Sequence, residues 1–182
     1  SISSTTDTTF RIWYNGNTAG DYATTSTYGA QGVWTSFRSV YHMKDDPAAG
    51  ILFDATVNSE DGTATGTMSV NDLVAGKVGD DSWSFDGSDD RVFLPPTIDS
   101  AGGVVEVWFK TTLGSGNQHI YNYSDDLANG FGAESECHQT VNANENTIQN
   151  YCWGGVAKNV GAGTASAEVD GDWHHFVGYY DD

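Results

Sequence analysis

Oxygen-bearing side chains crowd one short stretch of the sequence. Asp54, Asn58, Glu60 and Asp61 stand within eight residues of one another. Calcium takes about six to eight oxygen ligands from carboxylates, amides and backbone carbonyls, and the spacing here differs from that of an EF-hand. We expect a structural calcium site whose first ligands are Asp54, Asn58 and Asp61. The alternative is an ordinary loop in which these side chains close turns and face solvent.

Aspartates gather in two further loops, at Asp45 and Asp46 and again at Asp86, Asp89 and Asp90. Aspartate side chains accept hydrogen bonds from nearby backbone amides, so each of these groups by itself indicates a turn rather than an ion site. We therefore rank both loops below the first one as calcium candidates.

Aromatic side chains form the second group that could carry chemistry, since the chain holds 6 Trp, 9 Tyr and 8 Phe. Their rings stack on the apolar faces of sugars, while neighbouring polar side chains bind the hydroxyls. The ligand-binding candidates are Tyr121, Tyr123, Tyr151 and Trp153. Packing between strands is the alternative for each of them. Trp83, Trp108 and Trp173 lie inside alternating segments, and we expect these three in the core.

Two cysteines, Cys137 and Cys152, enclose a segment of modest length. In an extracellular β protein this spacing is typical of a disulfide across a hairpin or between neighbouring strands. A zinc site would need more Cys or His at ligand spacing, and in the sequence His138 is the one such neighbour. We therefore expect a disulfide between Cys137 and Cys152.

The charge of the chain excludes several classes of function. The 182 residues carry 7 Lys and Arg against 25 Asp and Glu, a formal net charge of −18. Nucleic acids and anionic membranes attract basic surfaces, so we expect neither as a partner. The sequence has no run of about 18 apolar residues, so we do not expect membrane insertion. Its first residues lack the features of a signal peptide, so we expect a mature form or a fragment. We expect the protein to function outside the cell or at its surface.

The composition also predicts the fold class. Turn-forming residues are abundant, strong helix formers are scarce, and the aromatic content is too high for a disordered chain. The expected strands span residues 10–14, 39–43, 82–85, 91–94, 104–110, 119–123, 130–133, 147–153 and 173–180, and a short apolar run stands at 51–53. Their recurrence every ~10–15 residues indicates an all-β sandwich or jelly roll, whose loops leave room for short helical turns, for instance near Asn71.

The strongest strand signal lies at 104–110. Successive side chains of a strand point to opposite faces of the sheet. Alternation therefore places Glu106 and Lys110 on one face, and Val105, Val107 and Phe109 on the other.

Several ordered motifs resemble those of a known family. They are Val40-Tyr41-His42-Met43, the loop from Asp54 to Thr63, Gly76-Lys77-Val78-Gly79, the stretch from Ser84 to Val92, the strand from Val105 to Lys110, and the strand from Asp172 to Asp181. Through them, residues 38–182 resemble a concanavalin A-like, laminin-G-like jelly-roll domain of bacterial surface proteins. The resemblance implies a two-sheet antiparallel jelly roll in which ions at the first loop help to hold the turns.

The residues upstream resemble a second family. The stretches from Ile12 to Asn17 and from Tyr28 to Trp34 are similar to the tail of an uncharacterised extracellular β module that often precedes such jelly rolls. We therefore expect two parts, a tail or extra strand over 1–37 and a jelly-roll domain over 38–182.

The jelly-roll resemblance also implies an incomplete C-terminus. The family's domain continues past Asp181 with further strands, so the resemblance implies that this chain is truncated there. The stretch from Thr8 to Gly16 resembles the strand that would follow. It could complete the sheet of its own chain or, by exchange, that of a neighbour.

Catalysis is the weakest expectation. Glycosidases of the concanavalin A-like superfamily use paired carboxylates on one strand, and the i, i+2 spacing of Glu134 and Glu136 places two acids on one face. The third acidic position fails, because residue 139 is Gln. We expect His42, His174 and His175 to pack or form hydrogen bonds rather than to act as bases or ligands. The chain is therefore not expected to be an enzyme, and a glycoside hydrolase remnant is the least favoured interpretation.

The resemblance and the composition together imply a non-enzymatic extracellular module of a larger surface protein, which binds carbohydrate or serves adhesion. Its partner would be a glycan or a cell-surface polysaccharide. The alternative is a structural or assembly subunit of a cell-surface or virion appendage, a filament or spacer that self-assembles through sheet edges by strand exchange. Fold by itself does not choose between these functions.

Overall fold

The computed structural model describes residues 23–27, 29–95, 102–112, 114–124, 136–142, 147–153, 158–162 and 169–181. Within these ranges all paired strands are antiparallel, and the helical elements are short 3-10 turns. The all-β prediction is thus confirmed for the described part of the chain. That part holds no helix of the length and apolarity that a membrane span requires.

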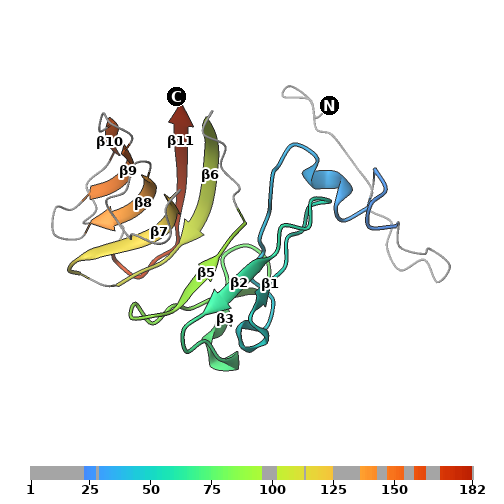
Figure 1. The fold of residues 1–182 in the computed structure, drawn as a ribbon. Helices are drawn as coiled ribbons and strands as arrows, with labels where there is room; N and C mark the ends of the chain where they lie inside the picture. The colour runs from blue at the N-terminus through green and yellow to red at the C-terminus, as the bar shows by residue number, and fades with distance from the viewer. Residues whose placement is uncertain are drawn as a thin grey trace, which may run out of the picture.

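Two small sheets lie in the first half of the chain (Figure 1). The first has the order β1-β2-β5, with β1 at Ile51–Leu52, β2 at Gly62–Thr65 and β5 at Arg91–Phe93. The second is a hairpin of β3 at Leu73–Ala75 and β4 at Asp81–Trp83. Leu52 and Trp83 are buried in this region, and the indole Nε1 of Trp83 donates to the backbone oxygen of Asp45 at 2.8 Å. Trp83 is therefore a core residue, as predicted.

Short 3-10 turns shape the connections around these strands. They are η1 at Gly32–Trp34, η2 at Pro47–Ala49 and η3 at Val70–Asp72. Asp46 caps η2 by accepting from the Ala48 amide, and Gly50 ends it at φ +73°, a left-handed conformation that glycine adopts without strain. Ser69 and Asp72 form a capping box around η3, so a short helical turn is present near Asn71.

The second half of the chain contains the longer strands, in a two-stranded and a four-stranded sheet. β6 at Gly102–Phe109 pairs with β11 at His174–Asp181, and every other strand of this half lies between them in sequence. The intervening strands are β7 at Asn117–Ser124, β8 at Glu136–Asn142, β9 at Thr147–Trp153 and β10 at Lys158–Ala162. They form a meander in the order β10-β9-β8-β7.

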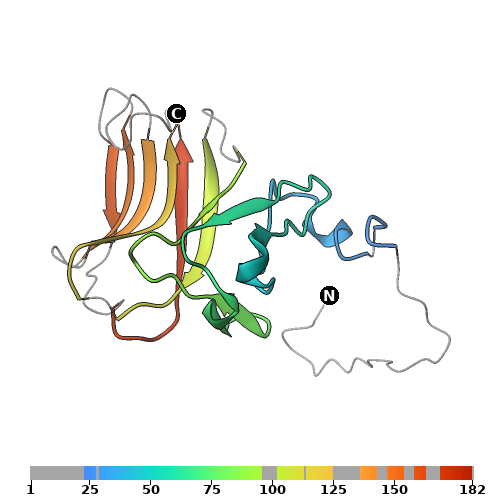
Figure 2. The same cartoon turned by 60° about the horizontal axis from the view of Figure 1, so that its bottom comes forward.

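The β6–β11 pair packs against one face of this meander (Figures 1 and 2). Val141 of β8 and Ile148 of β9 are buried at the centre of the contact. The partly buried apolar side chains packed against them are Phe109, Ile120, Val169 and Phe176. Gln139 of β8 is fully buried as well, and its Nε2 donates to the backbone oxygen of Val105 at 3.1 Å. The interior therefore combines an apolar cluster with a hydrogen bond between the two layers.

Six of the expected strands are present among the described residues. The strands expected at 82–85, 91–94, 104–110, 119–123, 147–153 and 173–180 correspond to β4, β5, β6, β7, β9 and β11, and the apolar run at 51–53 contains β1. The strand expected at 39–43 is wrong, because this stretch forms a single bridge, between Tyr41 and Asp54. The strands expected at 10–14 and 130–133 lie outside the described residues.

The expected division at residue 37 stays a prediction. Described residues on its two sides are in contact: the Gln31 side-chain amide donates to the backbone oxygen of Thr56 at 3.0 Å. The Trp34 ring lies 5.7 Å from that of His42, centroid to centroid. The segment that ends at residue 37 therefore contacts the stretch before β1 as well as the loop that follows β1.

Candidate functional site

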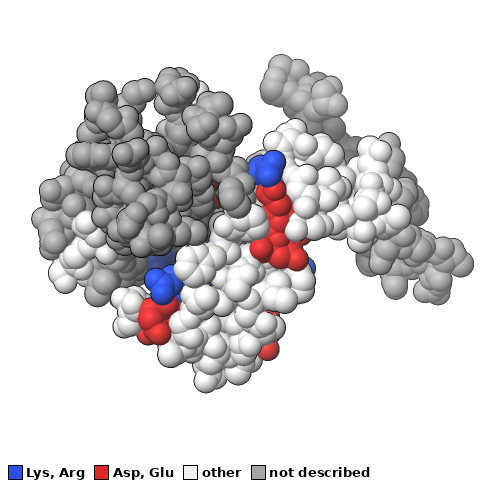
Figure 3. Space-filling model, in the orientation of Figure 1, with Lys and Arg blue, Asp and Glu red and all other residues white. Residues whose placement is uncertain are grey.

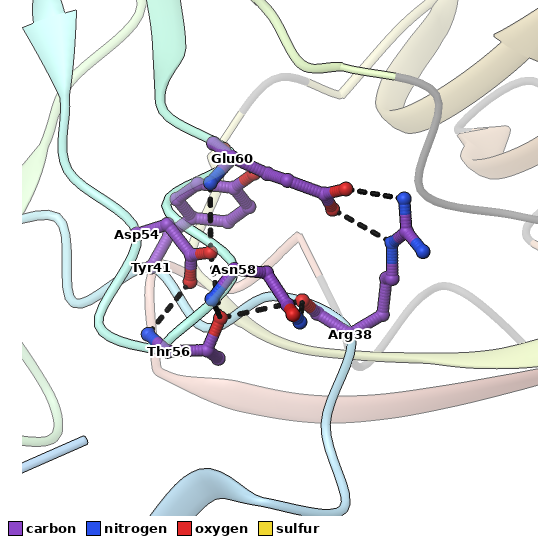
Figure 4. A network of polar contacts seen from close by, with 6 residues as sticks. All are labelled: Arg38, Tyr41, Asp54, Thr56, Asn58 and Glu60. Carbon is purple, nitrogen blue, oxygen red and sulfur yellow. Dashed lines mark hydrogen bonds and ion pairs between the residues drawn. The ribbon is translucent and has the colours of Figure 1, made fainter. Parts of the chain in front are cut away.

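The loop expected to bind calcium closes around the side chain of Asp54 (Figure 4). Asp54 is only 8% exposed. Its Oδ1 accepts from the amides of Val40 at 3.0 Å and Thr56 at 2.9 Å. Its Oδ2 accepts from the Thr56 hydroxyl at 2.7 Å and from the Glu60 amide at 3.0 Å. Each oxygen of this carboxylate thus accepts two hydrogen bonds, which is its ordinary capacity.

This environment changes the acidity of Asp54. Burial by itself raises the pKa of the carboxyl, because it penalises the charged form. The hydrogen bonds from Val40, Thr56 and Glu60 outweigh burial and hold the pKa below its ordinary value. The charged carboxylate is therefore the form that the fold stabilises.

The other two predicted ligands take part in the same closure. The side-chain amide of Asn58 donates to the backbone oxygen of Arg38 at 2.7 Å. Asp61 Oδ1 accepts from the Asp54 amide at 2.9 Å. Arg38 also forms a two-point ion pair with Glu60, in which Arg38 Nε lies 2.8 Å from Glu60 Oε2. In Figure 3, basic and acidic surface meet over the segment before β2. Calcium at this loop stays a prediction, and an ion bound to Asp54 would have to displace donors of the protein itself.

A second acidic group lies in the turn before β5. Ligand atoms of Asp86, Asp89 and Asp90 come within 4.8 Å of one another, the one group of three such residues found in the described ranges. Asp86 Oδ1 accepts from the Ser88 amide at 2.7 Å, and this bond is the main reason why the pKa of Asp86 lies below its ordinary value. Asp90 Oδ1 accepts from the Thr67 amide at 2.9 Å. These contacts are those of a closed turn, as the sequence indicated.

The four aromatic residues expected to bind ligand come from two strands. Tyr121 and Tyr123 lie in β7, Tyr151 and Trp153 lie in β9, and β8 runs between the two strands. In register, the first two stand opposite Gln139 and Cys137, whereas the other two stand opposite His138 and Glu136. One pair therefore stands opposite residues 137 and 139 of β8, and the other pair stands opposite residues 136 and 138. The four residues do not share one set of alternating positions in the sheet.

The two cysteines stand directly opposite each other in neighbouring strands. Cys137 of β8 is the register partner of Cys152 of β9. Opposed residues of an antiparallel pair have Cα atoms about 4.5–5.5 Å apart, which is within the span of a disulfide. The predicted disulfide, across neighbouring strands, is compatible with this backbone register.

The catalytic alternative gains no support from its third position. Gln139, which occupies that position, is fully buried between the two layers. Its Oε1 has no hydrogen-bond partner among the described residues. Glu134 lies outside the described residues, and the side chain of Glu136 is not described. Chemistry on a bound polysaccharide would need groups exposed to it, and Gln139 is not such a group.

The outward side of the β6–β11 pair carries a group of side chains that sequence reasoning missed. Exposed and less exposed residues alternate along both strands. We call the exposed set the β6–β11 outer face; its members are Val104, Glu106, Trp108, His175, Val177 and Tyr179. Trp108 is 40% exposed and Tyr179 is 62% exposed. The prediction that Trp108 lies in the core is therefore wrong.

The alternation of β6 could have corrected that prediction. Trp108 stands between Glu106 and Lys110, two residues from each, so all three share one face of the strand. The apolar side chain of Trp108 favours the core, whereas its place in the alternation of β6 puts it on the exposed face. Trp173, just before β11, is half-buried rather than fully buried, and Lys110 Nζ lies 5.9 Å from its ring centroid.

Three side chains gather around Trp108, two from the β6–β11 pair and one from the turn of the β3–β4 hairpin. His175 stands opposite it in register, with the ring centroids 4.8 Å apart and the planes at 28°. His175 Nε2 lies 2.8 Å from Glu106 Oε1. Lys77, in the turn between β3 and β4, places its Nζ 5.6 Å from the centroid of the Trp108 ring. Aromatic surface, a carboxylate, an imidazole and an ammonium are thus within reach of one ligand.

Comparison of the chain with protein-family models, curated proteins and solved structures finds no match in any of the three. The class of the protein therefore rests on its own architecture. In the described residues that architecture is all-β and antiparallel, with a polar–aromatic cluster on an exposed sheet face.

Proposed function

We propose that the chain is a non-enzymatic extracellular module that binds carbohydrate and thereby serves adhesion, built as a jelly-roll sandwich of the concanavalin A-like type. The observation that carries the proposal is the β6–β11 outer face. There, Trp108 and Tyr179 are exposed beside Val104 and Val177 on one side of a sheet. Aromatic and apolar side chains are costly to leave in water, so such a face is typical of a binding surface.

Carbohydrate fits this face better than an apolar ligand does. A sugar ring has an apolar face that packs on aromatic side chains and hydroxyls that need directed hydrogen bonds. The outer face offers both, because Glu106 and His175 lie between its apolar members. A sheet also presents these groups on a scaffold whose backbone hydrogen bonds hold it rigid, which lowers the entropic cost of binding.

The jelly-roll topology is supported by the pairing of β6 with β11. Strands far apart in the chain come together over an intervening meander, and side chains of both layers share one core. Such long-range antiparallel pairing across two layers is a property of β-sandwiches and jelly rolls.

A glycan array probed with the purified chain tests the proposal, followed by calorimetric titration of the strongest ligand. We expect Trp108→Ala to weaken binding by about tenfold, since an aromatic contact of this kind contributes roughly 1.5 kcal/mol. Phe53→Ala is the control, because Phe53 is 55% exposed, at least as much as Trp108, but directly follows β1, away from the β6–β11 outer face. A chain that binds no glycan, or variants that weaken binding equally, would contradict the proposal.

One observation favours assembly as a second candidate function. The β6–β11 layer has two described strands, whereas the sheet that it faces has four. An added strand, for which residues 8–16 have the expected sequence, would extend the smaller layer. Light scattering over a range of concentrations tests this: multimers that dissociate when residues 1–16 are deleted would support strand exchange, and a monomer at all concentrations would contradict it.

A further inference from the structure

We propose that Lys77, Glu106, Trp108 and His175 form one subsite, which takes a neutral saccharide unit through two adjacent hydroxyls. This inference rests on the proposed function and names the class of sugar that the β6–β11 outer face selects. It follows from the arrangement of the four side chains and from the balance of charge among them.

The aromatic part of the subsite is a cross-strand pair. Trp108 and His175 occupy the same register position of β6 and β11, and their rings stack at 4.8 Å. Directly opposed side chains of an antiparallel pair stabilise each other's positions. Trp108 and His175 therefore present a fixed apolar edge to a ligand, while Trp108 keeps 40% of its surface exposed.

The carboxylate of Glu106 lies beside this pair on the same face. His175 Nε2 is 2.8 Å from Oε1, a contact that orients the carboxylate and leaves Oε2 outside that hydrogen bond. About half of the Glu106 side chain is exposed. An exposed carboxylate oxygen held in place is a strong acceptor for a sugar hydroxyl, because hydrogen bonds to charged groups are stronger than neutral ones.

Lys77 completes the subsite from a different sheet. The turn between β3 and β4 brings its Nζ to 5.6 Å from the Trp108 ring centroid. The ammonium is a donor with three hydrogens, so it can bind the oxygen of one hydroxyl while Glu106 accepts the proton of the next. The subsite thus offers a donor and an acceptor around one aromatic ring, the two kinds of group that a pair of adjacent hydroxyls requires.

Charge selects a neutral ligand over an acidic one. Lys77 and Glu106 balance each other within the subsite, whereas the whole chain carries a net charge of −18. A uronate or sulfated polysaccharide would be repelled by that charge over about 8–10 Å at ordinary ionic strength. A second protein chain would have to bury Glu106 and Lys77 away from water, which is costly.

Affinity electrophoresis of the full chain tests the subsite. The probes are a soluble β-glucan, a mannan and a galactan as neutral polysaccharides, with polygalacturonate as the acidic counterpart. We expect at least one neutral polysaccharide to retard the chain and polygalacturonate not to. Glu106→Gln and Lys77→Met should each raise the dissociation constant by about tenfold or more, because each removes a charged hydrogen-bond partner.

Two variants serve as controls for the loss of charge. Asp89→Asn and Lys44→Met remove exposed charges of the same signs outside the β6–β11 outer face and should bind like the unmodified chain. Melting curves check that all four variants are folded. Loss of retardation in the two subsite variants with retention in the two controls would support the subsite.

The possible failures are distinguishable. Retardation of the unmodified chain that survives both Glu106→Gln and Lys77→Met would overturn the subsite and leave the proposed function in place. Stronger retardation by polygalacturonate than by every neutral polysaccharide would overturn the inferred sugar class. Absence of retardation by all four probes would overturn the proposed function and the subsite together.

Discussion

Asp54 shows at the scale of one residue how a buried carboxylate closes a loop. Four donors of Val40, Thr56 and Glu60 converge on it, three of them backbone amides. Without the carboxylate these donors would be left in a poorly hydrated place, at a cost of about 1–3 kcal/mol for each buried group. The conformation of the loop therefore depends on the buried carboxylate of Asp54 more than on the exposed acidic side chains around it.

We expect Asp54→Ala to lower the free energy of unfolding by about 3 kcal/mol, because it removes the common acceptor of this network. Urea denaturation measures the change. Asp89→Ala is a suitable control, since an exposed substitution changes stability by less than about 0.5 kcal/mol. Equal stability of the two variants would show that the network contributes little.

The lowered pKa of Asp54 also predicts a pH dependence. The folded chain binds the proton of this carboxyl less readily than the unfolded chain does, so the stabilisation is complete above the ordinary pKa of about 4. It is lost as the pH falls through the lower pKa of the folded state. We expect the difference in stability between the unmodified chain and Asp54→Asn to shrink below about pH 4. A difference that is constant or grows on acidification would contradict the assignment.

Chelation separates the two interpretations of the same loop. Calcium that binds only the folded chain must raise the melting temperature, and a chelator must then lower it. The calcium prediction implies that scanning calorimetry will show this drop in the unmodified chain. A melting temperature that is unchanged would assign the closure to the hydrogen bonds of Asp54, Asn58 and Asp61 without an ion.

At the scale of elements, the buried face of the meander depends on polar as well as apolar residues. Gln139 and Val141 of β8 are buried on the face that meets the β6–β11 pair, and Thr140, which stands between them, is buried on the opposite face of the meander. The Gln139 amide reaches across to β6, and the Thr140 hydroxyl lies 3.1 Å from His119 Nδ1 of β7. Because polar residues occupy buried positions of β8, its sequence has no apolar run that would predict a strand.

The expected disulfide belongs to the same scale, because it would join β8 to β9. A cross-link that closes a segment of about 15 residues is expected to stabilise a fold by roughly 3 kcal/mol, chiefly by restricting the unfolded chain. We therefore expect reduction, or the double change Cys137→Ser and Cys152→Ser, to lower the melting temperature clearly. Intact mass with and without reductant establishes whether the bond is present. Two free thiols in the oxidised preparation would contradict the prediction.

The whole molecule is governed by its excess of acids. With 25 Asp and Glu against 7 Lys and Arg, the carboxylates repel one another when the chain is folded compactly. The described ion pairs of Lys and Arg with acids include Arg38 with Glu60, which neutralises only one acid locally. This excess of negative charge favours solubility, and it lowers the stability of the folded state at low ionic strength.

We expect added monovalent salt to raise the melting temperature, because it screens repulsion among the carboxylates. The measurement is a thermal melt at several concentrations of sodium chloride and neutral pH. Potassium chloride at matched ionic strength is the control for a specific effect of the cation. A melting temperature that falls steadily with ionic strength would mean that attractive ion pairs outweigh the self-repulsion.

Local patterns in the sequence predicted much of the strand content. The alternation at 147–153 matches β9 at both ends, and the segments at 104–110 and 173–180 match β6 and β11 closely. β2, β3, β8 and β10 were not predicted, because they are short or rich in Gly, Thr and other polar residues. A strand of this kind forms only when neighbouring strands accept its hydrogen bonds.

By itself the sequence determined the all-β class, the period of the main strands and the acidity of the surface, because composition and alternation act over a few neighbouring residues. Only the tertiary structure decided that β6 pairs with β11 and that Lys77 from another sheet reaches Trp108. It also decided that Asp54 is an acceptor for protein donors. Such contacts join segments far apart in the chain, and they depend on which faces are buried together, which no local pattern specifies.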